Sequence, residues 1–338
     1  MTAPPTVALT GASGFVGGHV LAQLLAAGHK VRALVRNPAR FEPRVADTRL
    51  TVIEGSQFDD GPLARLVEGA EAVVHLVGII MEVPSHRQTF ERVHVLGTRR
   101  LIEAARSAGI QRWVQMSALG TRPDAVSTYH RTKWAAETAV RESGTAYTIF
   151  RPSIIHGPDG EFMELVKGFW CKCFPPFVPY FSARAGAQNI VEIKTALLWP
   201  FPSLRKHHDG DRYISTAPAG RLQPVWVEDV ARCFTGALDN DKSIGETYPM
   251  GGPDVYSWPQ LFDTCRRHLP RARNKKIVAI PAWYAKLIAG MPGVPFNRDQ
   301  VIMSQEDSVC EIGKVQSDFE FEAAPFETTL AEYAGAIR

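Results

Sequence analysis

The first half of the chain alternates between two patterns of apolar residues, one with helical spacing and one of short unbroken runs. Four times a helical pattern ends near a glycine, at Gly28, Gly69, Gly109 and Gly144, and a short apolar run follows. A glycine just past a helix is typical of the left-handed cap that ends it. Helices that alternate with short buried strands predict right-handed βαβ units and a parallel sheet. The pattern predicts strands near 5–10, 30–35, 50–53, 71–77, 111–117 and 145–151, and helices near 15–27, 61–68, 87–108 and 127–143.

The pattern changes after Pro152, where prolines and aromatic residues become dense, most of all in 169–181 and 197–204. A short strand followed by a helix is predicted again over 223–238. The chain has no internal repeat other than the alternation of strands and helices, and no low-complexity segment. The remaining expectations are helices near 257–268 and 281–290, and a helix end with a loose tail over the last twenty residues.

The clearest motif lies at the beginning of the chain, where residues 6–20 read TVALTGASGFVGGHV. Three glycines spaced three apart follow a buried strand and open a helix. Such a turn lets bare backbone approach a pyrophosphate, and the helix N-terminus offers free N–H groups to it. A bare glycine triplet also occurs in ordinary turns, but the strand before it and the helix after it favour a dinucleotide site. The predicted contacts are Gly11, Ser13, Gly14, Phe15, Val16 and Gly17.

The end of the second predicted strand favours one dinucleotide over the other. An acidic residue at this position binds the ribose 2′-hydroxyl of NAD, whereas an arginine suits the 2′-phosphate of NADP. Here the strand ends in Arg36, with no acidic residue before Glu42, so NADP(H) is favoured over NAD(H). The alternative is a solvated surface arginine. Ser56 and Gln57, after the third strand, are candidates for the adenine edge, although polar residues at strand ends are common.

Tyr129 and Lys133 form the candidate catalytic pair. They are four residues apart, which places both side chains on one face of a helix. An ammonium close to a phenol is expected to lower the phenol's pKa, so that the pair can pass a proton to or from a substrate oxygen. Ser117, at the end of the fifth strand, is expected to hydrogen-bond the same oxygen. The alternative is a surface tyrosine with a solvated lysine, because this spacing is frequent in helices.

Composition narrows the classes of partner and compartment. The 338 residues are 45% hydrophobic and 22% charged, with a net charge of +3, which is ordinary for a globular protein. The chain has no basic tail or stripe, so nucleic acid is excluded as an expected partner. Five cysteines lie at no zinc-binding spacing, which predicts free thiols in a reducing compartment and no metal. The first strand begins almost at once, so no signal peptide is expected, and the apolar runs are too short to span a bilayer.

At this point the chain resembles the extended and atypical branches of the short-chain dehydrogenase/reductase superfamily. The matching pieces run in chain order, and the order makes the match specific. They are TGASGFVG (10–17), HLVGI (75–79), VHVLGTRRLIEAA (93–105), VQMSALG (114–120), Tyr129 with Lys133, RPSIIHGP (151–158) and QPVWVEDVA (223–231).

The resemblance implies a Rossmann fold, a doubly wound parallel sheet that binds NAD(P) over residues 1–157. It implies a smaller C-terminal α/β substrate-binding portion over 158–338, interleaved with the Rossmann core. Ser117, Tyr129 and Lys133 would be the catalytic triad, with Lys133 also bonding the nicotinamide ribose. Val77 and Gly78 would line the cofactor, and Pro152, Ser153 and Ile155 would flank the nicotinamide.

Two features depart from the superfamily's pattern. His94 stands where many members carry an asparagine that supports the active-site helix, and we interpret it as a satisfied, partly buried histidine. The segment 161–222 is longer than in relatives and rich in Phe, Trp and Pro. It could cover a pocket for an apolar substrate, pack as a lid on its own core, or contact a membrane or partner complex through 161–205.

Three functions remain in competition. The first is an NADP(H)-dependent oxidoreductase acting on a carbonyl or alcohol of a hydrophobic small molecule. The second follows from the motifs HLVGI, VHVLGT and MSALG, which are most similar to the NAD(P)H-binding accessory subunits of respiratory complex I and their bacterial relatives, where the NADPH is thought to be structural. The third, a nucleotide-sugar epimerase or dehydratase, is disfavoured by Arg36. We expect a cytoplasmic location, with peripheral contact to the inner face of a membrane as an option.

Overall fold

The computed structural model describes residues 4–172, 177–183, 219–291, 294 and 296–337. These residues form two compact units, each assembled from separate stretches of the chain. Unit 1 consists of residues 1–155, 225–251 and 310–323, and unit 2 consists of residues 156–224, 252–309 and 324–338.

Unit 1 is built on a seven-stranded sheet in which all neighbouring strands are parallel. The strand order is β11-β6-β5-β4-β1-β2-β3, so the order reverses between β1 and β4. In open sheets of this kind, ligands bind beyond the carboxyl ends of the strands at that reversal. The predicted α/β doubly wound fold is confirmed. The strands are β1 (Val7–Thr10), β2 (Val31–Val35), β3 (Leu50–Glu54), β4 (Ala72–His75), β5 (Arg112–Met116), β6 (Ala146–Pro152) and β11 (Glu246–Met250).

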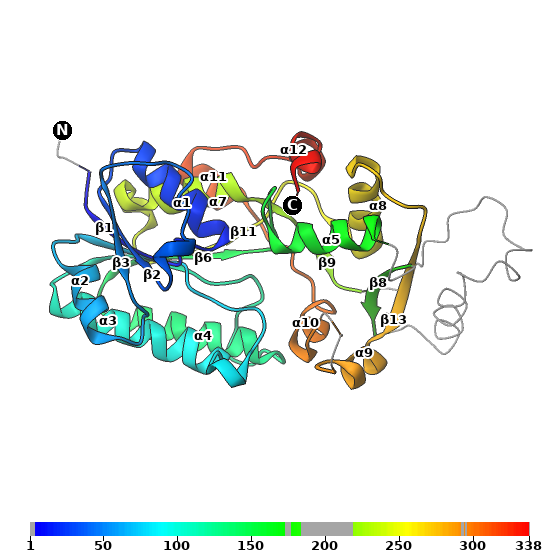
Figure 1. Cartoon of the computed structure of the whole chain (residues 1–338), viewed down its shortest axis with the longest axis horizontal. Coiled ribbons are helices and arrows are strands. Elements are labelled where there is room, and N and C mark those ends of the chain that lie inside the picture. Colours follow the sequence, from blue (N-terminus) through cyan, green and yellow to red (C-terminus); the bar gives the residue numbers. More distant parts are fainter. Residues whose placement is uncertain (1–3, 173–176, 184–218, 292–293, 295, 338) are drawn as a thin grey trace, which may run out of the picture. The chain divides into compact units, whose positions relative to one another are not determined.

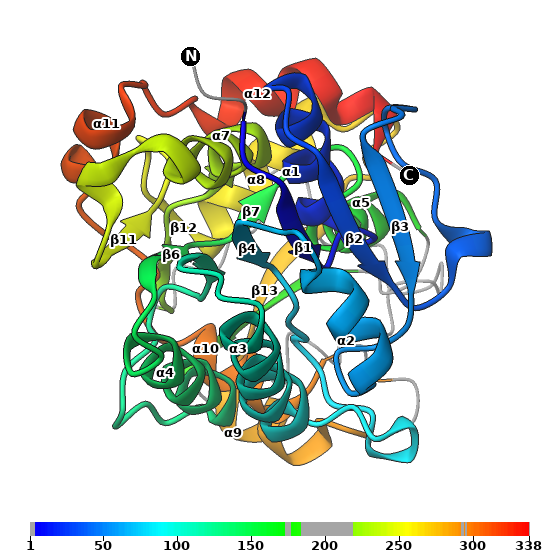
Figure 2. The same cartoon turned by 90° about the vertical axis from the view of Figure 1, so that its left-hand side faces the viewer.

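Helices cover both faces of this sheet (Figures 1 and 2). One face packs against α1 (Phe15–Ala26), α7 (Val227–Gly236) and α11 (Gly313–Phe319), which contribute Leu21, Phe234 and Val315 to a shared core. The other face packs against α2 (Asp60–Val67), α3 (Gly97–Ser107) and α4 (Thr128–Arg141), with Leu66, Leu101 and Val140. The apolar strands are buried on both sides, as expected for a parallel sheet. The six strands predicted in the first half are all present, and the predicted helix over 87–108 begins as a π-helix (Glu91–Leu96) before α3.

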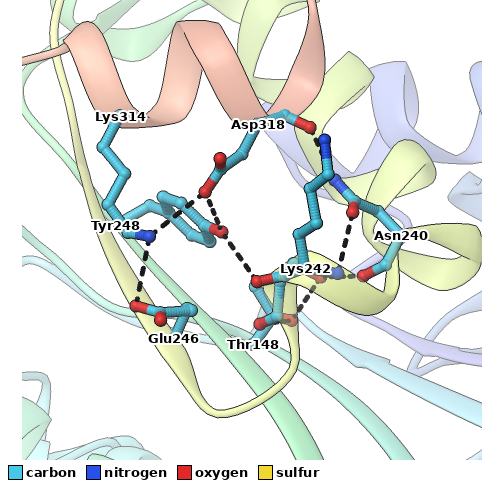
Figure 3. A network of polar contacts seen from close by, with 8 residues as sticks. Thr148, Asn240, Lys242, Glu246, Tyr248, Lys314 and Asp318 are labelled. Atoms are coloured by element: carbon cyan, nitrogen blue, oxygen red, sulfur yellow. Dashed lines mark hydrogen bonds and ion pairs between the residues drawn. The ribbon is translucent and has the colours of Figure 1, made fainter.

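A polar network holds α11 against the edge strand β11 (Figure 3). The Tyr248 hydroxyl donates to Asp318 Oδ2 at 2.8 Å, and Lys314 Nζ donates to the same oxygen at 3.2 Å. Asn240 Nδ2 donates to the Asp318 carbonyl oxygen at 2.7 Å. Lys314 also pairs with Glu246 at 3.6 Å. The network therefore joins a helix near the chain's end to the sheet begun at its start.

Unit 2 contains two small sheets and several helices. Strands β8 (Phe177–Ser182) and β13 (Lys276–Pro281) pair in parallel, and β9 (Arg221–Leu222) and β12 (Tyr256–Ser257) pair antiparallel. The two-residue strands β7 (Ile155–His156) and β10 (Val225–Trp226) lie where the chain passes from one unit to the other. The helices are α5 (Glu161–Cys171), α8 (Trp258–His268), α9 (Ala282–Ile288), α10 (Arg298–Met303) and α12 (Phe326–Tyr333).

The second half of the chain follows the sequence prediction less closely. The helices expected near 257–268 and 281–290 are present as α8 and α9. The expectation of a loose C-terminal tail is wrong, because α12 buries Phe326, Leu330 and Tyr333. Much of the proposed insertion, residues 184–218, lies outside the described residues. In the part of the chain that the structure describes, no helix is both long and apolar enough to cross a membrane.

Candidate active site

The glycine turn after β1 brings α1 into close backbone contact with the turn. Gly11 has a φ of +85°, a left-handed conformation that favours glycine. A Cβ on Gly17 would lie 1.9 Å from the carbonyl oxygen of Gly11, so only glycine permits this approach. A Cβ on Gly11 would meet the backbone of Leu76 at 3.1 Å. Backbone packing therefore requires two of the three predicted glycines.

The amino end of α1 is open to an anion. Gly14 is the N-cap residue, no side chain accepts a hydrogen bond from the first N–H groups, and the first turn carries no acidic residue. Ser13 and Gly14 are exposed, and Phe15 and Val16 are partly buried. Uncapped N–H groups and the helix dipole together attract phosphate. The residues present thus fit the pyrophosphate of a dinucleotide.

The connection between β2 and β3 carries four arginines, and two of them, Arg36 and Arg44, bear on the dinucleotide site. Arg36 directly follows β2 and is exposed. Arg44 lies beside the first turn of α1, because its Nε is 3.2 Å from the point that a Gly18 Cβ would occupy. The Arg44 charge also helps to lower the pKa of Glu228, on α7, although the main cause is a hydrogen bond from His19. This connection therefore carries positive charge to the amino end of α1.

The two candidates for the adenine edge are mostly engaged inside the protein. The Ser56 hydroxyl accepts from the Phe58 N–H at 3.3 Å. Gln57 is buried, and its Nε2 donates to the Val93 carbonyl oxygen at 3.0 Å, in a space left by Gly97. Among the described residues, Gln57 Oε1 has no hydrogen-bond partner. That oxygen is itself buried, so neither polar end of the Gln57 side chain is exposed at the predicted adenine site.

Lys133 is the buried centre of the candidate site. It lies on α4 one turn after Tyr129, and Ser127 caps this helix by accepting from the His130 N–H. Lys133 is 4% exposed, and its Nζ donates to the Met116 carbonyl oxygen at 3.2 Å. A Cβ on Gly78, in the loop after β4, would lie 3.0 Å from the same Nζ. The fold therefore brings Lys133 to the ends of two neighbouring strands, beside Gly78 and the residue that precedes Ser117.

The electrostatic expectation for the pair is wrong in one respect. Burial raises the pKa of Tyr129 to about 12, whereas the sequence reasoning expected a neighbouring ammonium to lower it. Burial also lowers the pKa of Lys133 to about 8, against the opposing charge of Glu137. Desolvation disfavours the charged form of both groups. The Tyr129 phenol is therefore neutral at pH 7. The charged form of Lys133 is favoured over the neutral amine by only about one pH unit there.

His94 joins the loop after β4 to the helix that carries the candidate pair. The Thr132 hydroxyl donates its single proton to the Tyr129 carbonyl oxygen at 2.9 Å. Thr132 Oγ1 therefore accepts from His94 Nδ1, also at 2.9 Å. The Ile79 N–H donates to His94 Nε2 at 3.1 Å. Burial and the charge of Lys133 lower the pKa of His94 to about 2, which keeps the ring neutral. The histidine is thus fully satisfied and links two backbone segments.

The remaining predicted residues lie at the ends of neighbouring strands. Ser117 is buried, its N–H donates to the Phe150 carbonyl oxygen at 2.7 Å, and its hydroxyl donates to Thr121 at 3.3 Å. The Ser153 N–H donates to the Met250 carbonyl oxygen at 2.8 Å. Val77 is partly buried and Gly78 exposed in the loop after β4. Pro152 ends β6, and Ile155 opens β7.

Sequence reasoning missed Glu137, the charged neighbour of Lys133. Glu137 is fully buried and pairs with Arg141 and Arg151, each at 2.6 Å. Its charge raises the pKa of Lys133 and so partly offsets the burial of the ammonium. The signal was present, because Tyr129, Lys133, Glu137 and Arg141 repeat every four residues along one helix face.

Two cavities in the described part of the chain are lined by other residues. One, of about 410 Å³ in unit 1, is lined by residues 236, 239–242 and 318–320, next to the network of Figure 3. The second, of about 630 Å³, lies in unit 2. Among the described residues, no three His, Cys, Asp or Glu side chains gather so that they could hold a metal ion.

Comparison with known proteins identifies the class of the chain. A family model for NAD(P)H-binding matches residues 11–167. The chain is similar to ceramide reductase of Caulobacter vibrioides, 38% identical over 197 residues that cover 58% of this chain and 60% of that protein. It is also similar to the mitochondrial NADH dehydrogenase [ubiquinone] 1 alpha subcomplex subunit 9 of Arabidopsis thaliana, 25% identical over 273 residues, covering 75% of this chain and 55% of that protein.

A third relative is sterol demethylase protein B of Methylococcus capsulatus, 29% identical over 256 residues, covering 67% of this chain and 74% of that protein. The chain thus spans 60% and 55% of the lengths of ceramide reductase and the Arabidopsis subunit. Among solved structures, MoeE5 in complex with UDP-glucose and NAD matches with a TM-score of 0.67 and 18% identity, covering 97% of each chain. At that identity the likeness shows the fold alone.

These findings confirm the family resemblance. Residues 11–167 contain an NAD(P)H-binding domain, the fold is similar to that of extended short-chain dehydrogenase/reductases, and the relatives of the chain include a complex I subunit. Its cofactor is a nicotinamide dinucleotide.

Proposed function

We propose that the protein is an NADP(H)-dependent oxidoreductase that acts on a carbonyl or alcohol of a hydrophobic small molecule through Ser117, Tyr129 and Lys133. The observation that carries this proposal is the buried Lys133 ammonium, which lies against the Met116 carbonyl oxygen and Gly78, one helical turn from Tyr129. Burying a charged group costs free energy unless it is paired and hydrogen-bonded, so a buried ammonium is unusual. Groups with perturbed pKa values cluster at functional sites.

Each residue has a role that follows from its chemistry. When bound, the nicotinamide supplies or accepts the hydride. The Tyr129 hydroxyl passes a proton to or from the substrate oxygen, Ser117 hydrogen-bonds that oxygen, and Lys133 stabilises negative charge on the phenol. Because the pKa of Tyr129 is raised to about 12, the residue is a proton donor at neutral pH. This favours reduction of a carbonyl over oxidation of an alcohol.

The preference for NADP(H) rests on the positive charge of the β2–β3 connection. Arg36 follows β2 and is exposed, and Arg44 lies beside the first turn of α1. Guanidinium groups suit the additional 2′-phosphate of NADP, and no acidic residue follows β2 before Glu42.

The proposed substrate class rests on two relatives. Their names, ceramide reductase and sterol demethylase protein B, refer to apolar lipids. We place the reaction in the cytoplasm, at the inner face of a membrane, where such substrates are available.

The test uses the Tyr129→Phe variant, which removes the proton donor and keeps the ring. We expect NADPH to bind with unchanged affinity, measured by calorimetry, and NADPH-dependent reduction of a keto-ceramide or a sterol ketone to fall by about 10²-fold or more. Tyr147→Phe is the matched control, because Tyr147 lies near the amino end of β6, whereas the candidate site lies at the carboxyl ends of the strands. Equal turnover by the Tyr129→Phe variant would exclude the mechanism.

A second candidate is a non-catalytic NADPH-binding module of a membrane complex. The similarity to the complex I subunit of Arabidopsis thaliana favours it, because that similarity covers 75% of this chain. The two candidates differ in how the nucleotide is held. Purified protein would be denatured and the released nucleotide identified by mass. Stoichiometric NADPH that survives purification and is oxidised by no carbonyl substrate supports the module, whereas free exchange supports the enzyme.

A further inference from the structure

A strongly basic stretch of unit 2 has no part in the proposed reaction. Residues 266–276 read RRHLPRARNKK, with six Lys or Arg and no Asp or Glu. The first two arginines are neutralised, because Arg266 pairs with Asp263 and Arg267 pairs with Glu327. The arginines of the following turn, Arg271 and Arg273, pair with no carboxylate of the described residues.

These two arginines line the cavity of about 630 Å³ in unit 2. Lys167 and Cys171 of α5 line it as well, together with Pro270 and Gly335. Three cations from two separate segments therefore converge on one cavity. Like charges held together repel, so the arrangement calls for an anion among them.

The cations are positioned by neutral partners. Arg273 Nε donates to the Cys171 carbonyl oxygen at 2.9 Å, and Lys167 Nζ donates to the Ile337 carbonyl oxygen. Each of these bonds fixes a side chain without cancelling its charge. The terminal nitrogens of the Arg273 guanidinium, and the whole guanidinium of Arg271, make no hydrogen bond to the described part of the chain. They remain available to a ligand.

The backbone at Arg271 is strained. The Ala272 N–H donates to the Leu269 carbonyl oxygen at 3.4 Å, which closes a β-turn with Pro270 in its second position. Arg271 occupies the third position with a φ of 63°. Turns of this type favour glycine there, because other residues rarely adopt a left-handed backbone. An arginine at a position better suited to glycine points to a function of its side chain.

We propose that this cavity binds a phosphate group, held by Arg271, Arg273 and Lys167. Guanidinium forks bind tetrahedral oxyanions with two parallel hydrogen bonds, and an ammonium adds a point charge. The phosphate can belong to a soluble phosphate ester or to a phospholipid headgroup. Both present the same chemistry, and the experiment below separates them.

The experiment measures binding of two probes to the full chain with NADPH in excess, so that the dinucleotide site is filled. Inorganic pyrophosphate, followed by calorimetry, represents the soluble source. Phosphatidylcholine vesicles with and without phosphatidic acid, followed by co-sedimentation, represent the lipid source. Binding of pyrophosphate supports a soluble ligand, and binding only to vesicles that contain phosphatidic acid supports a headgroup. Binding of neither probe overturns the proposal.

Variants decide whether the cavity is responsible. The double variant Arg271→Gln with Arg273→Gln should weaken binding at least tenfold. Arg298→Gln, which removes a charge from α10, should leave it unchanged. Arg271→Gly should weaken binding while raising the melting temperature, because glycine relieves the strained turn. Equal binding by the wild type and the double variant, or a lower melting temperature for Arg271→Gly, would contradict the argument.

Discussion

At the scale of single residues, the site is dominated by the burial of one charge. Lys133 is 4% exposed, and burial lowers its pKa from 10.5 to about 8. Two features reduce the cost, a hydrogen bond to the Met116 carbonyl oxygen and the negative charge of Glu137. Because the pKa of Lys133 is still lowered, the hydrogen bond and the Glu137 charge do not offset the whole cost of burial. The charged lysine therefore destabilises the folded state at pH 7.

The first prediction at this scale is that Lys133→Met stabilises the protein while it abolishes activity. A lowering of the pKa from 10.5 to about 8 corresponds to about 3 kcal/mol, so we expect a gain of about 1–3 kcal/mol in the free energy of unfolding at pH 7. Urea denaturation measures this gain. Lys30 is exposed and offers a control, because Lys30→Met should change the free energy of unfolding by less than about 0.5 kcal/mol.

The gain should depend on pH in one direction. Between pH 8 and 10.5 the unfolded lysine binds a proton and the folded one does not, so wild-type stability rises with pH across this window. The advantage of Lys133→Met should therefore shrink as pH rises from 8 to 10.5. An advantage that is constant over this range would show that the pKa of Lys133 is not lowered.

The identities of the candidate residues could be predicted from sequence, whereas their electrostatics could not. Spacing alone places Tyr129 and Lys133 on one helix face, and strand ends place Ser117 and Gly78 at one edge. The direction of the Tyr129 pKa was predicted wrongly, because burial is set by the surrounding fold. The bridge that His94 makes between Ile79 and Thr132 joins separate segments, so only the structure reveals it. The catalytic roles themselves stay a prediction.

At the scale of elements, α11 shows how a late segment is fixed to an early sheet. Its Asp318 accepts hydrogen bonds from the buried Tyr248 hydroxyl and from Lys314 (Figure 3). The hydrogen bond from Tyr248 is the main cause that lowers the pKa of Asp318. Removing the carboxylate would leave a buried phenol without its best acceptor, and such groups are costly.

We therefore predict that Asp318→Ala lowers the free energy of unfolding by about 1–3 kcal/mol at pH 7. Because the folded-state pKa of Asp318 is lowered, its contribution is present above the ordinary pKa of 3.8 and is lost as pH falls further. The difference between wild type and variant should close in acid. Asp254→Ala, at an exposed acidic residue, serves as the control for urea denaturation. A difference that persists unchanged below the ordinary pKa would argue against this role.

The elements that were predicted best from the sequence are those that consist of an unbroken run of apolar residues. Strands β1 to β6 are short apolar runs between helices, and each was expected near its observed position. Strand β11 was missed, because the sequence ETYPM alternates poorly and contains Pro249. Proline is tolerated there because β11 is an edge strand. Strand β8 was missed for the same reason, since Pro179 lies inside it and it pairs with only one neighbour, β13.

At the scale of the whole molecule, neither unit is a continuous piece of chain. The core of unit 1 contains Leu21 and Phe150 from the first half of the sequence, and Phe234, Tyr248 and Val315 from the second. One face of the sheet is therefore covered largely by helices that arrive late in the chain. A cut after residue 157 would leave only α1 on that face, without α7 and α11.

The last prediction concerns such a cut. A fragment of residues 1–157 lacks α7, β11 and α11, which supply buried Phe234, Tyr248, Met250 and Val315 to the core. Loss of one large core side chain costs about 2–5 kcal/mol, and total stability is about 5–15 kcal/mol, so the fragment should not fold. We expect no cooperative urea transition and no NADPH binding. A polypeptide that joins 1–155, 225–251 and 310–323 through glycine-rich linkers restores the missing core, and it should recover both properties. Cooperative unfolding of the 1–157 fragment alone would mean that the late segments only decorate a sheet that is already stable, and the joined polypeptide would then gain nothing over it.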